Sequence, residues 1–365
     1  MDENTLSILA TASRRAYLTL RRRQPVAAVL DVLDALNLET RHHQRPVLSH
    51  YHATPTGWHV VIHMPAGIAS KEITTRLDYF AEQCNGTVTA SPIGAEVHLD
   101  IATKPLPKFV PFAYKPTDCM QIPLGMTHSG MLSIGLPSLP HLFVAGNTGG
   151  GKTCFLRVAA VSLLRQGCIV VVIDLKGLDF HHLASHALVV DTDSETLAVL
   201  HLLNREHNRR KEVLKRAGCV NFQEYTGDMP YLVVLIDELA ELTDKDSQAL
   251  LNRLLRLSRA MGISIIAATQ RPSHTVYAKF TDSRMLFAGR LCFTMPTAED
   301  SRLILNNDAA AKIPQDVPGR AIWQRGKQTE VQCMYLPVKQ ANAVLADVSR
   351  REVFAIEQQR HRLPT

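Results

Sequence analysis

The spacing of apolar and polar positions divides the chain into two parts. In the first part, a strand pattern at 57–64 is followed by a helix pattern at 71–84, and strand patterns near 87–91 and 95–102 come next. After about residue 120, short apolar strands alternate with helices, which is the signature of a parallel α/β sheet. The sequence therefore predicts a small β-α-β-β domain ahead of a larger α/β domain.

Proline and helix signals set the remaining boundaries. Apolar spacing predicts a helix over 5–23 that carries five arginines, and Pro25 ends it before a second helix at about 26–37. A solvated face is favoured for these arginines over contact with DNA or a partner. Ser70 is expected to cap the helix 71–84, and four prolines within 103–118 indicate a linker. The predicted parts are an N-terminal helical segment 1–45, a small α+β domain 46–104, a linker 105–119, an α/β domain 120–340 and a C-terminal helical tail 341–365.

Composition adds modest constraints. Lys and Arg total 40 against 34 Asp and Glu, a surplus that fits an acidic partner without requiring one. Seven scattered cysteines without a C-x-x-C pair indicate free thiols in a reducing compartment. No apolar run approaches the roughly 18 residues that a membrane span needs, and the acidic start does not resemble a signal peptide. We expect a soluble, cytoplasmic protein that a partner can recruit to a membrane.

A phosphate-binding loop is the strongest local motif. Residues 146–153 match G-x-x-x-x-G-K-[ST], and they lie between an apolar strand at 141–145 and a helix at 154–166. Glycines let successive N–H groups turn toward phosphate oxygens at a helix N-terminus. Lys152 is expected to reach the β and γ phosphates, and the Thr153 hydroxyl to ligate Mg²⁺. The expected ATP contacts are Gly146, Asn147, Thr148, Gly149, Gly150, Gly151, Lys152, Thr153 and Cys154.

Polar residues at the ends of two further apolar strands complete a hydrolytic site. The strand 231–236 ends in Asp237 and Glu238, and carboxylates there are costly unless they serve a cation or a reaction. Asp237 is expected to support Mg²⁺, and Glu238 to act as general base toward the attacking water. Gln270 follows the strand 263–268 and is expected to sense the γ-phosphate.

These motifs resemble the FtsK/SpoIIIE family of DNA translocases. The matching stretches keep the family's order, and Thr-Gln-Arg-Pro-Ser after a phosphate loop and an Asp-Glu strand is the most specific of them. The resemblance covers roughly 120–338, and the preceding small domain also resembles the one that precedes the family's motor. The matching stretches are 140–153, 171–176, 233–242, 258–262, 268–273 and 300–302.

The resemblance implies a RecA-like P-loop NTPase fold with a parallel sheet flanked by helices. It implies a homo-hexameric ring with double-stranded DNA in its pore, and ATP and Mg²⁺ as cofactors. Arg259, on a helix at about 249–261, falls where the family keeps an arginine that reaches the neighbouring subunit's nucleotide. Arg302 lies in a stretch near the subunit interface. Arg271 and Arg284 fall at or near positions that face DNA.

Three features depart from the family pattern. Ala298 stands where the family usually has a lysine, which weakens the expectation of a second trans-acting cation. Leu175 replaces the proline of Asp-Pro-Lys, so the turn geometry is expected to differ. The chain also ends too soon after its last predicted strand for the winged-helix module of chromosomal members. With no membrane segment, these features favour a motor of a plasmid or integrative element.

The leading hypothesis is an ATP-driven DNA translocase that serves transfer, replication or segregation of a mobile element. Two alternatives stay open. The first is a secretion-system ATPase that acts on protein, and the second is a nucleotide-gated adaptor for a relaxase or replication protein that hydrolyses ATP slowly. Stimulation of ATP hydrolysis by duplex DNA discriminates between them.

Overall fold

The computed structural model describes residues 26–116, 120–139, 141–270 and 286–349. They form two compact units. The first contains the residues up to Leu106 together with the short segment Thr127–Gly130, and the second contains the rest. The predicted N-terminal helix 5–23 with its arginine cluster, Arg271, Arg284 and the tail beyond residue 349 lie outside the described residues.

The first unit is a four-stranded antiparallel sheet in the order β1-β2-β4-β3. Three of its strands correspond to predicted ones, and the fourth, β1, was not predicted because its sequence has little alternation and faces solvent along most of its length. Apolar side chains of β2 and β4 pack against the helices to form the core. The elements are α2 (Val26–Leu36), β1 (Val47–Thr54), β2 (Gly57–His63), α3 (Lys71–Thr74), α4 (Leu77–Cys84), β3 (Thr87–Ile93) and β4 (Glu96–Ala102).

The helix predicted over 71–84 is two helices. Ser70 stands at the N-cap position of the first, as predicted, but it has helical backbone angles and its side chain makes no capping bond. At Arg76 the backbone leaves the helical region, with φ −120° and ψ 30°. The Thr75 hydroxyl donates to the Lys71 carbonyl at 2.7 Å, a back-bond that competes with continuation of the helix.

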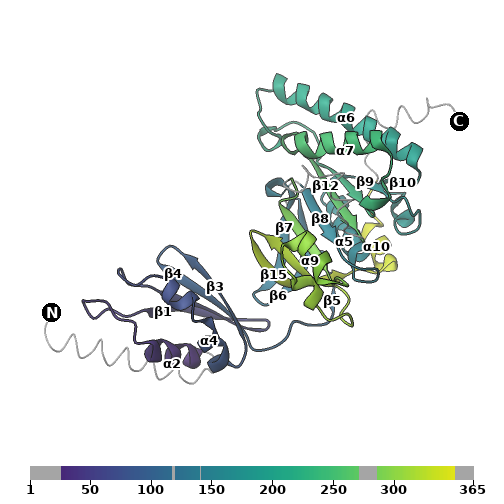
Figure 1. The fold of residues 1–365 in the computed structure, drawn as a ribbon. Helices are drawn as coiled ribbons and strands as arrows, with labels where there is room; N and C mark the ends of the chain where they lie inside the picture. Colours follow the sequence, from purple (N-terminus) through teal and green to yellow (C-terminus); the bar gives the residue numbers. More distant parts are fainter. Residues whose placement is uncertain (1–25, 117–119, 140, 271–285, 350–365) are drawn as a thin grey trace. The chain divides into compact units, whose positions relative to one another are not determined.

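The second unit contains one large mixed sheet, part of which is the predicted parallel sheet. Its parallel strands run β10-β9-β11-β12-β8-β13, and antiparallel strands β14, β15, β6 and β7 extend it (Figure 1). The parallel strands are β8 (His141–Ala145), β9 (Ile169–Ile173), β10 (Leu188–Val190), β11 (Leu232–Ile236), β12 (Ile263–Thr269) and β13 (Gly289–Phe293). The others are β5 (Val110–Pro111), β6 (Gln121–Thr127), β7 (Gly130–Gly135), β14 (Arg320–Arg325) and β15 (Lys327–Tyr335).

The antiparallel extension was not predicted. Strands joined by tight turns pair without an intervening helix, so the alternation of strands and helices does not reveal them. Part of the segment expected to be a linker also joins the sheet, since β5 pairs with the end of β15.

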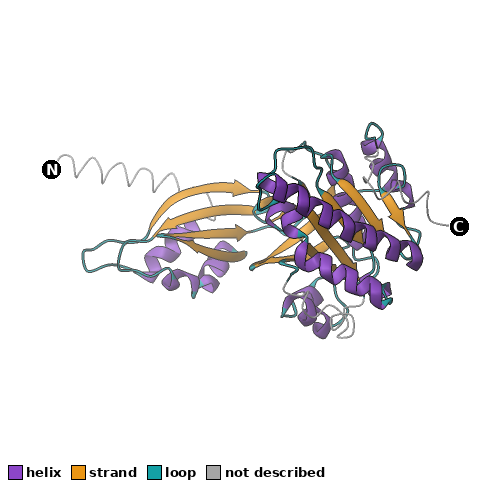
Figure 2. Ribbon diagram, turned by 90° about the horizontal axis from the view of Figure 1, so that it is seen from above, coloured by secondary structure: helices purple, strands orange, loops and turns teal. Residues whose placement is uncertain are grey.

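Helices cover both faces of the parallel strands, as the predicted fold class requires (Figure 2). One face packs against α5 (Lys152–Arg165) and α10 (Val338–Leu345). The other packs against α6 (Asp193–Arg216), α7 (Lys245–Leu257) and α9 (Ala298–Leu305). Among the described residues, no helix combines the length and apolar character that crossing a bilayer demands.

Arg210 ties α6 to the amino-terminal edge of the parallel strands. Its side chain is 1% exposed and donates to the Glu206 carboxylate at 2.9 Å. It also donates to the carbonyls of Pro230, Met261 and Gly262 at 2.8, 3.1 and 3.2 Å. Pro230 precedes β11 and Gly262 precedes β12, so one guanidinium satisfies backbone groups at the start of two strands.

Arg210→Met should lower the free energy of unfolding by about 3 kcal/mol, because it leaves Glu206 and three carbonyls without this partner. Chemical denaturation followed by circular dichroism measures the loss. Arg209→Met is the matched control: Arg209 also pairs with Glu206 but is 45% exposed, so its loss should stay under about 1 kcal/mol. Equal losses for the two variants would contradict the assigned role of Arg210.

Candidate nucleotide-binding site

The phosphate loop joins β8 to α5 and is shaped by its neighbours. Gly146 and Gly151 have φ of 154° and 122°, and a Cβ on either would lie within 2.9 Å of the Phe293 side chain. The Asn147 N–H donates to the Thr294 carbonyl at 3.0 Å, and the Gly319 N–H donates to the Gly150 carbonyl at 2.9 Å. The end of β13 and the turn before β14 thus hold the loop in shape.

Lys152 lies beneath the loop with its side chain 4% exposed. Its ammonium donates to the carbonyls of Gly146 and Asn147 at 2.6 and 3.0 Å. Burial lowers the pKa of Lys152 to about 8, while the charges of Glu238 and Asp237 act in the opposite direction. Because the crest of the loop at 147–149 is exposed, a phosphate can approach it from solvent.

The structure brings the two predicted magnesium ligands together. The Thr153 hydroxyl donates to Asp237 Oδ1 at 3.3 Å. The other oxygen of this carboxylate is buried and has no hydrogen-bond partner. Burial raises the pKa of Asp237 to about 6, and the charge of Asp179 adds to this rise. An orphaned carboxylate oxygen beside a hydroxyl fits a hard cation such as Mg²⁺.

Glu238 is 5% exposed and lies after β11, where it contacts the end of β12. Its Oε1 accepts from the Thr269 hydroxyl at 2.7 Å, and its Oε2 accepts from the Gln270 N–H at 2.8 Å. The Gln270 side-chain oxygen in turn accepts from the Thr148 hydroxyl at 2.8 Å. The predicted base and sensor are therefore linked to the phosphate loop by a continuous hydrogen-bonded chain, the Thr148–Gln270–Glu238 chain.

Two residues of this site were missed by the sequence analysis. Thr269 contacts Glu238 as described, and the Lys176 ammonium lies 3.8 Å from Glu238 Oε2. Thr269 ends β12 and Lys176 follows β9, and both strands neighbour β11. The signal in the sequence that could have identified them is that polar residues at the carboxyl ends of parallel strands often contact a ligand.

Arg259 is not near the nucleotide site of its own chain. The helix predicted at 249–261 ends at Leu257, and Arg259 begins a separate 3₁₀ turn at the start of β12. Burial lowers the pKa of His141, and the charge of Arg259 adds to this effect. Burial raises the pKa of Tyr231, and the charge of Arg259 opposes that rise. These two residues lie at the amino ends of β8 and β11. The seven residues of β12, roughly 20 Å of strand, separate this edge from the phosphate loop.

Two other predicted site residues make different contacts. Arg302 lies on α9, exposed, and pairs with Glu299 of the same helix at 3.5 Å. The Cys154 sulfur faces the end of β15, where it accepts from the Leu336 N–H at 3.3 Å. Neither side chain contacts a residue of the phosphate loop in the part of the chain that the structure describes.

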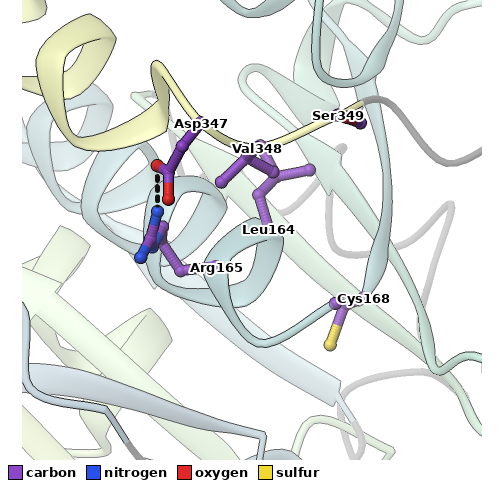
Figure 3. A pocket seen from close by; sticks show the side chains of 7 residues that line it. Leu164, Arg165, Cys168, Asp347, Val348 and Ser349 are labelled. Atoms are coloured by element: carbon purple, nitrogen blue, oxygen red, sulfur yellow. Dashed lines mark hydrogen bonds and ion pairs between the residues drawn. The ribbon is translucent and has the colours of Figure 1, made fainter.

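A cavity of about 380 Å³ lies elsewhere in this unit (Figure 3). It forms between the end of α5, the start of β9 and the segment after α10, and Arg165 pairs with Asp347 at its wall. Its lining contains no residue of the phosphate loop, so it is separate from the nucleotide site. Its lining residues are Leu164, Arg165, Gly167, Cys168, Asp347, Val348 and Ser349.

The fold and the strand–loop–helix motif are those of a P-loop NTPase. No family model matches the chain. It is, however, 30% identical over 237 residues to a protein named DNA translocase FtsK from Chlorobaculum tepidum, and 31% identical over 224 residues to one from Lactiplantibacillus plantarum. These matches cover 57% and 54% of this chain but only 29% and 28% of the relatives. The resemblance to FtsK-type translocases is thus confirmed for about half of the chain, which spans under a third of those relatives.

Solved structures share the fold. The conjugation coupling protein TcpA of pCW3, in its monomer form with ATPgS, aligns over 89% of this chain and 99% of its own, with a TM-score of 0.62 and 23% identity. The cytoplasmic domain of the type VII secretion ATPase EccC from Thermomonospora curvata aligns over 69% of this chain and 34% of its own, with a TM-score of 0.59 and 22% identity. Both confirm the predicted P-loop NTPase architecture.

Gly151→Ala should weaken nucleotide binding at least about tenfold, equivalent to about 1.4 kcal/mol, because its Cβ would meet Phe293 at 2.9 Å and the Gly319 backbone at 3.1 Å. Titration with a fluorescent ATP analogue measures the change. Gly149→Ala is the matched control, since its φ is also positive but nothing lies within 4 Å of its Cβ. An equal or larger loss in Gly149→Ala would contradict the packing argument.

Proposed function

We propose that the chain is an ATP-driven motor that moves double-stranded DNA and works as a homo-hexameric ring. The observation that carries the proposal is the Thr148–Gln270–Glu238 chain, which joins the phosphate loop to a buried carboxylate. Identity to proteins named DNA translocase FtsK supports DNA as the substrate. The expectation that the motor serves a mobile element, with a relaxase, replication or secretion partner, stays a prediction.

Lys152 performs the first task, nucleotide binding. Its ammonium now donates to two loop carbonyls, and these bonds are exchanged for phosphate oxygens when ATP enters. The gain is large because the site is buried, where a cation and an anion attract strongly. Thr153 and Asp237 would hold Mg²⁺, which supplies neutralisation of phosphate charge when it is bound.

Glu238 performs the second task, activation of water. An ionised carboxylate has about four acceptor positions. The Thr269 hydroxyl and the Ala240 N–H occupy two on Oε1, and the Gln270 N–H occupies one on Oε2. These donors fix the orientation of the carboxylate and leave acceptor capacity for a water. That water loses a proton to Glu238 as its oxygen bonds to the γ-phosphorus and the bond from the γ-phosphorus to the β–γ bridging oxygen breaks, which releases ADP and phosphate.

Gln270 connects this chemistry to DNA. Its side-chain oxygen accepts from the Thr148 hydroxyl on the phosphate loop, and its N–H donates to the carboxylate of Glu238, the proposed general base. The proposed DNA-contacting residues Arg271 and Arg284 follow it in sequence. Binding or release of nucleotide at the phosphate loop is therefore passed through Thr148 and Gln270 toward the proposed DNA-contacting residues.

Arg259 supports the ring. It lies at the amino edge of the parallel strands, whereas the phosphate loop lies at the carboxyl edge. An arginine placed there can serve catalysis only at the nucleotide of a second copy. Arg302, also exposed, is proposed to lie near the same interface.

Duplex DNA should stimulate ATP hydrolysis, and Glu238→Gln should retain ATP binding while kcat falls at least about 100-fold. Steady-state hydrolysis with and without linear duplex DNA, together with ATP-analogue titration, measures both effects. Glu241→Gln is the matched control, because Glu241 is exposed on the turn that follows Glu238. Hydrolysis that ignores DNA would favour a protein-directed ATPase or a slow nucleotide-gated adaptor. A near-normal rate in Glu238→Gln would place the base elsewhere.

Arg259→Ala should reduce kcat by about 10³-fold or more, because an arginine supplied in trans stabilises charge on the γ-phosphoryl oxygens. Arg256→Ala, an exposed arginine in the last turn of α7, is the control and should be near wild type. Mixing Arg259→Ala with Lys152→Ala subunits should restore part of the activity, since some interfaces then join an intact Lys152 to an intact Arg259. Full activity of Arg259→Ala alone in DNA-bound rings would refute the assignment.

A further inference from the structure

Asp174 directly follows β9, and Asp237 directly follows the neighbouring strand β11. In the parallel register of β9 and β11, Ile173 is paired with Ile236, so Asp174 and Asp237 are the next residues along neighbouring strands. The Asp237 N–H donates to the Ile173 carbonyl at 3.2 Å, which carries the pairing to the strand ends. Position alone therefore places two carboxylates side by side at the carboxyl edge.

Both carboxylates also belong to the same face of the sheet. Alternate residues of each strand share a face, and Val172 and Leu235, two positions before each aspartate, pack in the core cluster that contains α5. The α5 helix begins at Lys152, followed by Thr153. Asp174 is thus on the side of the sheet where the predicted magnesium ligands lie.

The Asp174 side chain is buried and only half satisfied. It is 1% exposed. One carboxylate oxygen, Oδ2, accepts from the N–H groups of Asp179 and Phe180 at 3.0 and 3.2 Å. The other oxygen, Oδ1, is buried without a hydrogen-bond partner, as is Oδ2 of Asp237. Two orphaned carboxylate oxygens on adjacent strands are unfavourable unless a cation joins them.

We propose that Asp174 is a second carboxylate of the magnesium site, acting beside Asp237 when nucleotide is bound. The assignment rests on the proposed function in one respect, since it takes the ligand to be a nucleotide with Mg²⁺. Mg²⁺ is usually held by one or two carboxylates together with substrate phosphates and water. Among the described residues, no group of three His, Cys, Asp or Glu side chains can hold a metal. A magnesium site with two carboxylates, in which phosphate oxygens supply further ligands, agrees with that finding.

Other charges face the same edge and must be separated from Asp174 in any test. Asp179 is half-buried on the turn after β9, and Lys176 pairs with Glu238. Lys152 lies under the phosphate loop. Asp191 lies at the end of β10, one strand further from Asp237 than Asp174 is, and it offers a matched position for a control.

Asp174→Asn tests the proposal, because it removes the charge but keeps an oxygen that can accept from Asp179 and Phe180. The affinity of the full chain for a non-hydrolysable ATP analogue is measured with and without Mg²⁺. We expect the Mg²⁺-dependent gain in affinity to fall at least about tenfold, which corresponds to about 1.4 kcal/mol, and binding without Mg²⁺ to be unchanged or tighter. The melting temperature of the ligand-free variant should rise, because a buried unpaired charge has been removed.

The controls separate the possible failures. Asp191→Asn should keep the full Mg²⁺ gain, and Asp237→Asn should lose it. If Asp237→Asn loses the gain and Asp174→Asn keeps it, Asp174 is not part of the site and the proposed function stands. If wild-type protein shows no Mg²⁺ gain, both the inference and the proposed nucleotide chemistry are wrong. A lower melting temperature with an unchanged Mg²⁺ gain would assign Asp174 to the β9 turn alone.

Discussion

Parallel pairing in the order β9-β11-β12-β8 is the constraint on which the site depends. Parallel strands place their carboxyl ends at one edge of a sheet. In this register Ile236 is paired with Ala267, and Thr269 is paired with Ala145. Ile236 is followed by Asp237 and then by the predicted base Glu238, Thr269 is followed by the predicted sensor Gln270, and Ala145 is followed by Gly146, the first glycine of the phosphate loop. A shift of register on any one strand would move its polar residue out of hydrogen-bonding distance.

The same edge concentrates ionisable groups that are costly to bury. Lys152, Asp237 and Glu238 are each at most 5% exposed. Part of the cost is offset within the protein, since Glu238 accepts from Thr269 and Gln270 and Lys152 donates to loop carbonyls. The cost of burying the Asp237 charge is offset less, and burial accordingly raises the pKa of Asp237. A site built for a charged ligand is expected to be incompletely compensated without it.

The opposite edge of the sheet is organised by a different charge. Arg210 holds the starts of β11 and β12 by their carbonyls, and two of those carbonyls belong to Met261 and Gly262, at the end of the turn that Arg259 begins. This buried cation therefore fixes the backbone that presents Arg259 at the surface. The proposed ring rests on the two edges together, since the residues predicted to bind and hydrolyse ATP lie at one edge and the arginine proposed to assist them lies at the other.

Local chemistry determined much of this protein from its sequence. The phosphate loop, the Asp237-Glu238 strand end and the Gln270 strand end each have a motif whose residue types are demanded by phosphate, cation or water chemistry, so they were identifiable before any contact was known. The alternation of strands and helices likewise predicted the parallel part of the sheet. What the sequence could not determine depends on contacts between distant segments. The strand β1 and the antiparallel strands gain stability from partners, not from their own alternation. The helix before Arg259 ends at Leu257 although Ser258 keeps helical backbone angles, so local backbone preference does not mark its end. Tertiary structure alone decided that Lys176 faces Glu238, and that Asp174 and Asp237 share an edge and a face, because strand order and register bring together residues that lie more than sixty positions apart in the chain.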